Sequence, residues 1–197
     1  KRAKFIPYAN VNPLTWSYVG VAENIDCPHI IHAPSHRDVK GTQYILDAFD
    51  RLEKEGIKFR STLIENMSNE NARKIYETAD LIVDQLLAGY YGGFAVECMA
   101  LGKPVICYMR DSDMPYLPEK MQSDMPIINA KPDTIYAVLK DYLTTRKHEL
   151  HALGLKSRKY VEMWHDPVKI AQITLSDYES AYLQKHGKNK VEKACAV

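Results

Sequence analysis

The chain contains 197 residues, of which 46% are hydrophobic and 26% charged, and its formal net charge is +1. This balance fits one globular domain of ordinary size and argues against a surface built to bind nucleic acid or an anionic membrane. No apolar run approaches the roughly 18–20 residues of a membrane-spanning helix, and the first residues lack the apolar segment of a secretory signal peptide.

Short apolar runs alternate along the chain with segments whose apolar residues recur at helical spacing. Residues 28–34 are bounded by prolines and contain β-branched side chains, which predicts a strand. Residues 41–56 follow with Ile45, Phe49 and Leu52 on one helical face. The same criteria predict strands at residues 59–65, 81–87, 104–109 and 126–130, and helices at residues 68–80, 92–101, 133–143, 146–164 and 167–185.

Five predicted strands therefore alternate with helices across short loops. This pattern indicates right-handed βαβ units, and hence an α/β fold with a doubly wound, Rossmann-like parallel sheet. Ligands of such sheets bind beyond the carboxyl ends of the strands. We expect chemistry in the strand-to-helix loops at residues 35–42, 66–69, 85–93 and 110–116. The last loop continues as a polar stretch with three prolines, which is interpreted either as a mobile flap or as a connection without a role.

The first loop reads SHRDVKGT and leads into the helix that we expect to begin near Gly41. A helix N-terminus offers unpaired N–H groups and a partial positive charge, which suits a phosphate. Arg37 would add a fork-shaped donor and Lys40 a mobile ammonium, while Gly41 would let an anion approach the backbone. A solvated basic loop without a ligand explains the same residues equally well, so both interpretations stay open here.

The third loop continues into the stretch GYYGGFAVECMALGKPVI. Gly89, Gly92 and Gly93 can expose backbone N–H groups at a second helix N-terminus and form another anion cradle. Glu97 lies about one turn further along that helix, where its carboxylate can accept two O–H donors from a vicinal diol. On this interpretation the glycines hold a phosphate and Glu97 holds a ribose. The alternative is that Glu97 pairs with a nearby cation such as Lys103.

Metal and dinucleotide chemistry are disfavoured. The chain has no G-x-G-x-x-G after the first strand and no G-x-x-x-x-G-K-[ST], the fingerprints of dinucleotide-binding and P-loop proteins. His29, His32 and His36 resemble metal ligands, but the odd spacing of His29 and His32 on a strand turns them to opposite faces. The four cysteines match no C-x-x-C spacing and are expected to be reduced thiols of a cytoplasmic protein. We expect no metal and no other cofactor.

Two basic residues before a KG pair, followed by an acidic residue in a GGFAVECMALGKPVI helix, resemble the C-terminal domain of GT-B glycosyltransferases of the retaining family-4, or group 1, type. Members of that family carry an R…KG loop and then E-G-F-G-L-x-x-x-E-A-M-A-x-G-x-P-V-I. The resemblance covers about residues 30–108, and residues 94–106 are its most specific part. It implies the C-terminal half of a GT-B fold, which binds the nucleoside diphosphate sugar that serves as donor substrate.

The resemblance also assigns roles to individual positions. Lys40 would contact the donor diphosphate with Arg37 beside it, and both would act in catalysis by offsetting charge on the leaving group. Glu97 would hold the ribose hydroxyls, and Gly92 and Gly93 would offer backbone amides to a phosphate or to the donor sugar. The further nucleotide-sugar-binding residues of this expectation are Ser35, Gly41, Glu65, Asn66, Gly89 and Phe94.

Three departures from the family pattern bear on the substrate. Gly89 stands where the first glutamate of the E-x7-E motif usually contacts the transferred sugar, so the sugar and the effect on activity stay open. The segment between the second and third strands is short, so either residues 65–67 replace the missing frame for the base or the base is recognised in another way. Asp84 and Gln85 stand where many members have a proline–serine pair.

The implied organisation has three parts. Residues 1–27 would form a linker and lead-in segment, residues 28–165 the nucleotide-sugar-binding domain, and residues 166–197 a C-terminal helix with a flexible tail. The implied reaction is transfer of a glycosyl group, expected to be a hexosyl, from a nucleoside diphosphate sugar to an acceptor held by an N-terminal domain of the same protein. A glycan or lipid-linked acceptor of polysaccharide biosynthesis would fit, in the cytoplasm and with attachment to the inner face of the membrane left open.

Two rival functions are carried forward from the sequence. A GT-B-like nucleotide-sugar epimerase would use similar phosphate contacts but needs acid and base groups near the sugar. A non-catalytic nucleotide-sugar-binding module is favoured by the glycine at position 89. The isolated chain is expected to bind a donor without transferring its sugar.

Overall fold

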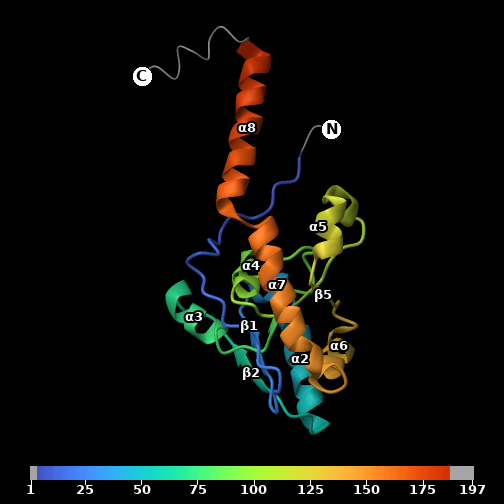
Figure 1. Cartoon of the computed structure of the whole chain (residues 1–197). Helices are drawn as coiled ribbons and strands as arrows, with labels where there is room; N and C mark the ends of the chain where they lie inside the picture. Colours follow the sequence, from blue (N-terminus) through green and yellow to red (C-terminus); the bar gives the residue numbers. More distant parts are fainter. Residues whose placement is uncertain (1–3, 187–197) are drawn as a thin grey trace.

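The computed structural model describes residues 4–186 and contains a five-stranded sheet with helices on both faces (Figure 1). Its strand order is β2-β1-β3-β4-β5, and all neighbouring strands are parallel. The strands are β1 (His29–His32), β2 (Arg60–Leu63), β3 (Leu81–Val83), β4 (Val105–Cys107) and β5 (Ile128–Asn129). The predicted α/β fold with a doubly wound parallel sheet is therefore confirmed.

The strands are connected and followed by helices, several of which cover the two faces of the sheet. The helices are α1 (Arg37–Lys40), α2 (Thr42–Lys54), α3 (Asn69–Tyr76), α4 (Gly93–Ala100), α5 (Glu119–Asp124), α6 (Ile135–Leu143), α7 (Leu150–Trp164) and α8 (Pro167–His186), with 3-10 segments η1 (Met114–Tyr116) and η2 (Lys147–Glu149). α2 packs against α6 on one face, whereas α4 packs against α7 on the other, where α3 joins them. Each helix that the sequence predicts is present, with ends shifted by a few residues.

Three short helical segments are absent from the sequence-based prediction. α1 occupies the loop after β1, and Gly41 separates it from α2 with a left-handed backbone at φ 73°. η1 and α5 lie within the polar stretch that was interpreted as a flap or a connection. Met121 of α5 is fully buried against the core, so a single apolar side chain anchors this helix. Because the rest of α5 is polar, its sequence shows no apolar periodicity that predicts a helix.

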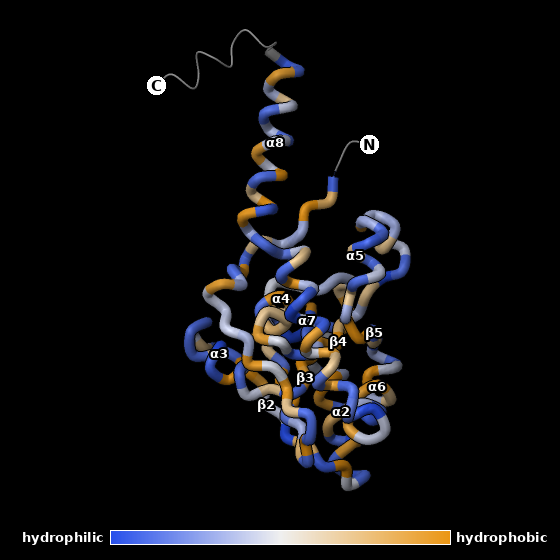
Figure 2. The backbone as a smooth tube through the Cα atoms, viewed as in Figure 1, coloured by the Kyte–Doolittle hydropathy of each residue, from blue (hydrophilic) through white to orange (hydrophobic). Residues whose placement is uncertain are grey.

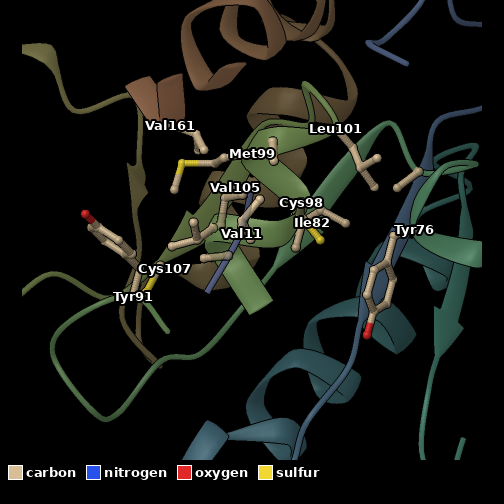
Figure 3. Close-up of a cluster of buried hydrophobic side chains, with 14 of the residues drawn as sticks. Val11, Tyr76, Ile82, Tyr91, Cys98, Met99, Leu101, Val105, Cys107 and Val161 are labelled. Atoms are coloured by element: carbon tan, nitrogen blue, oxygen red, sulfur yellow. The ribbon is translucent and has the colours of Figure 1, made fainter. Parts of the chain in front are cut away.

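Alternate strand residues point into two apolar clusters, one under each helix layer. Ile31, Ile82 and Val105 belong to the cluster beneath α3, α4 and α7, whereas Ile30 and Leu81 face α2 and α6. Figure 3 shows the first cluster, in which Ile82 and Val105 lie among side chains of α4. Because both faces of the sheet are covered, the strands read as continuous apolar runs in the sequence.

Part of the predicted linker packs against the domain. Val11 is 1% exposed and Trp16 is 9% exposed, and Val11 lies within the first apolar cluster (Figure 3). Arg158 of α7 clamps this segment by donating hydrogen bonds to the carbonyls of Pro13 and Trp16. The domain boundary at residue 28 stays a prediction, and the structure adds that residues before it contribute to the core.

The last helix, α8, extends away from the sheet and its flanking helices (Figure 1), and hydrophobic and hydrophilic residues alternate along it (Figure 2). The predicted flexible tail falls mainly on residues 187–197, which lie outside the described residues. Within residues 4–186, no helix combines the length and the apolar character that crossing a membrane requires.

Candidate functional site

The candidate site lies at the carboxyl edge of the sheet, where the strand order changes direction. The chain runs from β1 outward to β2 and then crosses to β3 on the other side of β1. In doubly wound sheets the loops that diverge at such a switch point leave a crevice for a ligand. Lys40 lies in the loop region after β1 and Asp84 directly follows β3, so both belong to this crevice.

Lys40 and Asp84 form the polar centre of the crevice. The Nζ of Lys40 lies 2.6 Å from Oδ1 of Asp84, and Oδ2 of Asp84 accepts the backbone N–H of Gly92 at 2.8 Å. The side chain of Asp84 is fully buried, and that of Lys40 is 14% exposed. Lys40 is therefore not a solvated surface lysine, because a buried carboxylate holds its ammonium at the start of α4.

The N-cap residue of α4, Gly92, has no side chain to cap the first turn, and its own N–H is the one that donates to Asp84. A Cβ at Gly92 would lie 3.5 Å from Nζ of Lys40 and 3.7 Å from Oδ2 of Asp84. At Gly93 a Cβ would come within 3.0 Å of Nδ2 of Asn10, which donates a hydrogen bond to the Gly93 carbonyl. Glycine at both positions keeps side-chain atoms away from the N–H groups that open the helix.

Glu97 lies one turn into α4 and is half-buried. The side-chain amide of Asn69, at the start of α3, donates to Oε2 of Glu97 at 3.4 Å. Burial raises the pKa of Glu97 above its ordinary value, against the opposing effects of the Asn69 hydrogen bond and the Arg73 charge. The alternative pairing with Lys103 does not occur, because Lys103 is buried beyond the other end of α4 and donates to two backbone carbonyls.

A polar cavity of about 590 Å³ opens between the ends of β1 and β2 and the start of α3. Four residues of the predicted set line it: Ser35, Arg37, Glu65 and Asn66. Asn69 also lines it, and this residue connects the cavity to Glu97. Arg37 and Glu65 form an ion pair in which Nε lies 2.7 Å from Oε1. A second cavity, of about 480 Å³, lies against β5 and α7 and contains none of the predicted site residues.

Two other predicted binding residues pack against neighbouring side chains. A Cβ at Gly41 would lie 3.3 Å from atoms of both Leu86 and Leu87. The ring of Phe94 lies 5.0 Å from the ring of Tyr76, measured between centroids. Packing accounts for both residue types without a ligand, so their part in binding stays a prediction.

Gly89 lies beneath the side chain of Arg110. Its φ of 88° is in the left-handed region, and a Cβ there would come within 3.0 Å of the Arg110 side chain. The guanidinium of Arg110 donates to the carbonyl of Ala88 at 3.3 Å and to Asp113 at 3.2 Å. Where the resembling family has a glutamate, this chain has a glycine covered by a cation, and a larger side chain fits neither the backbone nor the space.

The two strand histidines are hydrogen-bonded within the fold. Nε2 of His29 lies 2.8 Å from the hydroxyl of Thr62, and Nε2 of His32 lies 2.9 Å from the hydroxyl of Thr42. Each Nδ1 lies within hydrogen-bond distance of a backbone carbonyl, and burial lowers the pKa of both rings. Among residues 4–186, no group of three or more His, Cys, Asp or Glu side chains is arranged to hold a metal ion.

Sequence reasoning misses Asp84, Asn69 and Asn10 as parts of the site. Asp84 has a visible signal, because it is the single carboxylate that closes the apolar run of β3 at its ligand-binding end. Asn69 looks only like a helix-capping residue in the sequence. Asn10 has no local signal, because its contact with Gly93 joins residues 83 positions apart.

Several solved proteins share this fold, and a sucrose-phosphate synthase and an O-GlcNAc transferase are among them. Sucrose-phosphate synthase from Thermosynechococcus elongatus matches with a TM-score of 0.63 over 91% of this chain and 52% of its own, at 17% sequence identity. HepE from Anabaena, solved with UDP and glucose, gives a TM-score of 0.55 over 79% of this chain and 49% of its own, at 12% identity. The pneumococcal O-GlcNAc transferase GtfA, solved with UDP and GlcNAc, gives a TM-score of 0.50 over 82% of this chain and 38% of its own, also at 12% identity.

These likenesses confirm the predicted fold, which is that of one Rossmann-like half of a GT-B glycosyltransferase. The chain spans about half the length of the first two solved proteins and less of the third. No protein-family model matches the sequence, and no curated protein matches it significantly.

Proposed function

We propose that this chain is the C-terminal, donor-binding half of a GT-B glycosyltransferase, which transfers a glycosyl group from a nucleoside diphosphate sugar with retention of configuration. One observation carries the proposal. The Lys40 ammonium lies beside the start of α4, whose N-cap glycine provides no side-chain cap, and the Glu97 carboxylate lies one turn further along that helix, at the switch point of a fold that proteins solved with UDP share. A cation, a row of N–H donors and a carboxylate acceptor are what a diphosphate followed by a ribose requires.

The diphosphate would bind between Lys40 and the first turn of α4. An ammonium has three N–H donors, and Asp84 accepts only one of them, so two remain for phosphate oxygens. The positive end of the α4 dipole adds to this attraction. When the bond to the sugar breaks, negative charge grows on the leaving diphosphate, and a cation already in place stabilises that charge without reorganisation.

Arg37 would join the diphosphate site only after its contact with Glu65 changes. Their side chains are 51% and 28% exposed, so solvent screens the pair and rearrangement costs little. Lys40 differs, because its partner is fully buried. We therefore assign the main phosphate contact to Lys40 and a secondary one to Arg37.

The nucleoside would extend toward α3. The Glu97 carboxylate accepts a long hydrogen bond from Asn69 and a further one from the Asn10 side chain, yet burial still raises its pKa, so strong donors would favour its charged form. The 2′ and 3′ hydroxyls of a ribose would supply two such donors. The base would then enter the polar cavity of about 590 Å³, where Glu65 and Asn66 offer a carboxylate and an amide for its recognition.

The acceptor would be held by an N-terminal domain of the same protein. This part of the proposal is supported by the fact that the chain spans about half the length of two solved proteins whose fold it shares. A hexosyl donor and a glycan or lipid-linked acceptor in the cytoplasm fit the proposal. The chain alone would bind the donor without transferring its sugar.

Calorimetric titration with UDP, GDP, ADP and their sugars tests the proposed function. We expect 1:1 binding of one nucleoside diphosphate and of its sugar, with a clear preference among the three bases. Absence of binding for all three bases at millimolar ligand would contradict the proposal.

A non-catalytic nucleotide-sugar-binding module is the second candidate, and the contact between Gly89 and Arg110 favours it. Position 89 offers no carboxylate to the sugar, and a guanidinium occupies the adjoining space. Both candidates predict donor binding by this chain. They differ in the longer protein, where only the enzyme transfers a labelled sugar to an acceptor extract.

A further inference from the structure

The charges of the crevice are balanced before any ligand binds. Lys40 is paired with Asp84, and Arg37 is paired with Glu65. Each of the two cations expected to bind the diphosphate therefore already has a carboxylate partner. From these four side chains a diphosphate meets no net positive charge, although it carries several negative charges itself.

The two ion pairs differ in how easily a ligand can separate them. Glu65 lies at the wall of an open cavity, whereas the Asp84 side chain is fully buried at the end of β3. Both oxygens of Asp84 are occupied, one by Lys40 and the other by the N–H of Gly92, and the thiol of Cys107 lies 3.9 Å away. Asp84 has no solvated position to move to, so it stays beneath Lys40 when a phosphate arrives.

We propose that Asp84 is a positioning residue that fixes the Lys40 ammonium at the first turn of α4 and, through its own charge, lowers the affinity for the diphosphate. The inference rests on the proposed function, because it takes Lys40 as the phosphate contact. Lys40 would bridge the two anions, with one N–H on Asp84 and the others left for phosphate oxygens. The attraction exerted by the lysine is thereby partly cancelled by the aspartate directly behind it.

This arrangement distinguishes the product from the donor. A free nucleoside diphosphate has a terminal phosphate whose second ionisation lies near a pKa of about 6, whereas the sugar of the donor substitutes that oxygen. The product is therefore the more negative species at neutral pH. Asp84 repels the product more strongly than the donor, which favours release of the nucleoside diphosphate after transfer.

The test is the variant Asp84→Asn, which keeps the shape and one acceptor oxygen but removes the charge. We expect UDP and inorganic pyrophosphate to bind about tenfold more tightly than to the wild type. The affinity for UDP-glucose should increase less than the affinity for UDP does. Asp80→Asn is the matched control, because Asp80 stands at the other end of β3 and accepts the N–H of His29 at 2.9 Å. That control should leave all three affinities unchanged.

A second measurement needs no variant. If Asp84 neutralises Lys40, the wild-type affinity for pyrophosphate falls less than about threefold between low and high salt, because little net charge is available for screening. A merely structural Asp84 would leave the phosphate affinity of folded Asp84→Asn unchanged. Unchanged or weaker binding by that folded variant, or a steep salt dependence of the wild type, would overturn the inference.

Failure of the inference is distinguishable from failure of the proposed function. Wild-type binding of a nucleoside diphosphate reports on the function, whereas the ratio of Asp84→Asn to wild-type affinity reports on Asp84. If no nucleoside diphosphate binds, the proposed function fails. Binding of inorganic pyrophosphate then tests the role of Asp84 separately, because Asp84→Asn should still bind pyrophosphate more tightly than the wild type does.

Discussion

Lys40 and Asp84 follow two neighbouring strands and are 44 positions apart, yet Nζ of one lies 2.6 Å from Oδ1 of the other. The backbone reinforces this contact, because the N–H of Leu86 donates to the Lys40 carbonyl at 3.0 Å. The pair therefore joins the two loops of the crevice and sets the position of a cation at the start of α4. Removing one member of such a buried pair leaves the other charge without a partner.

The first prediction concerns Lys40. Lys40→Met should weaken UDP binding by roughly 10- to 100-fold, because one charged hydrogen-bonding partner contributes about 1.5–3 kcal/mol. It should also lower the free energy of unfolding by about 3 kcal/mol, because Asp84 stays buried without its partner. Calorimetry and denaturant unfolding measure the two effects.

The control for this variant is Lys54→Met. Lys54 is 73% exposed and pairs with Asp50 on the surface of α2, so its loss should change neither binding nor stability measurably. Equal UDP affinity in Lys40→Met and in the wild type would remove Lys40 from the site.

A second prediction tests the ribose contact of Glu97. The wild type should bind UDP more tightly than 2′-deoxy-UDP, because the carboxylate accepts the 2′ hydroxyl. Glu97→Gln should reduce this preference by about tenfold. A hydrogen bond to the charged carboxylate contributes about 1.5 kcal/mol more than one to the neutral amide that replaces it. Competition titrations with the two nucleotides measure the ratio. An identical ratio in both proteins would exclude Glu97 from ribose recognition.

A third prediction follows from the raised pKa of Glu97. Burial favours the protonated form in the folded state, so the ionised carboxylate destabilises the fold at neutral pH relative to an ordinary exposed glutamate. This cost appears as the pH rises through the range from the ordinary pKa of glutamate to the raised one, and it is absent below both. Glu97→Gln should therefore be more stable than the wild type at pH 7 and equally stable at acidic pH.

Denaturant unfolding at several pH values checks this behaviour. Glu70→Gln is a suitable control, because Glu70 lies on the exposed surface of α3 and pairs with Lys74 at the surface. A Glu97→Gln variant that is less stable than the wild type at pH 7 would show that Glu97 stabilises the fold. The glutamate would then be explained by stability and not by ligand binding.

A fourth prediction separates two causes of strain at Gly89. Gly89→Ala should lower the free energy of unfolding by about 1–3 kcal/mol, because φ is 88° and a Cβ would come within 3.0 Å of Arg110. Gly56 has a similar φ of 75°, but a Cβ there meets nothing within 4 Å, so Gly56→Ala reports the backbone effect alone. Gly89→Ala should therefore lose more stability than Gly56→Ala, and the double variant Gly89→Ala/Arg110→Ala should regain this extra loss. Equal losses in the two single variants would show that Arg110 contributes no strain.

The fold was predictable because its signals are local. The apolar runs of β1, β3 and β4 are covered on both faces, and α2 carries its apolar residues at helical spacing. The local pattern of each segment therefore predicts its secondary structure. The polar composition of α5 hides it, because its anchor is a single buried methionine. The packing of Trp16 is equally invisible, since it depends on Arg158 from a distant helix.

The site was predictable only in part, because its energetics depend on pairs. Lys40, Gly92 and Glu97 could be placed together from the topology of a parallel sheet, and in the structure Lys40 lies beside Gly92 at the start of α4, with Glu97 one turn further along that helix. The partners that decide their charge, Asp84 and Asn69, could not be assigned. A sequence shows which residues are ionisable, but not which of them are buried against one another.

Amide NMR of the chain during titration with UDP tests the central claim most directly, because glycine N–H signals report on backbone contacts at α4. The account predicts that the amides of Gly92 and Gly93 shift progressively and saturate with the same dissociation constant that calorimetry gives. The amide signals of residues 123–125, 127 and 128, at the second cavity, should stay unchanged. Saturating binding that shifts the second cavity and leaves both glycine amides in place would contradict the account.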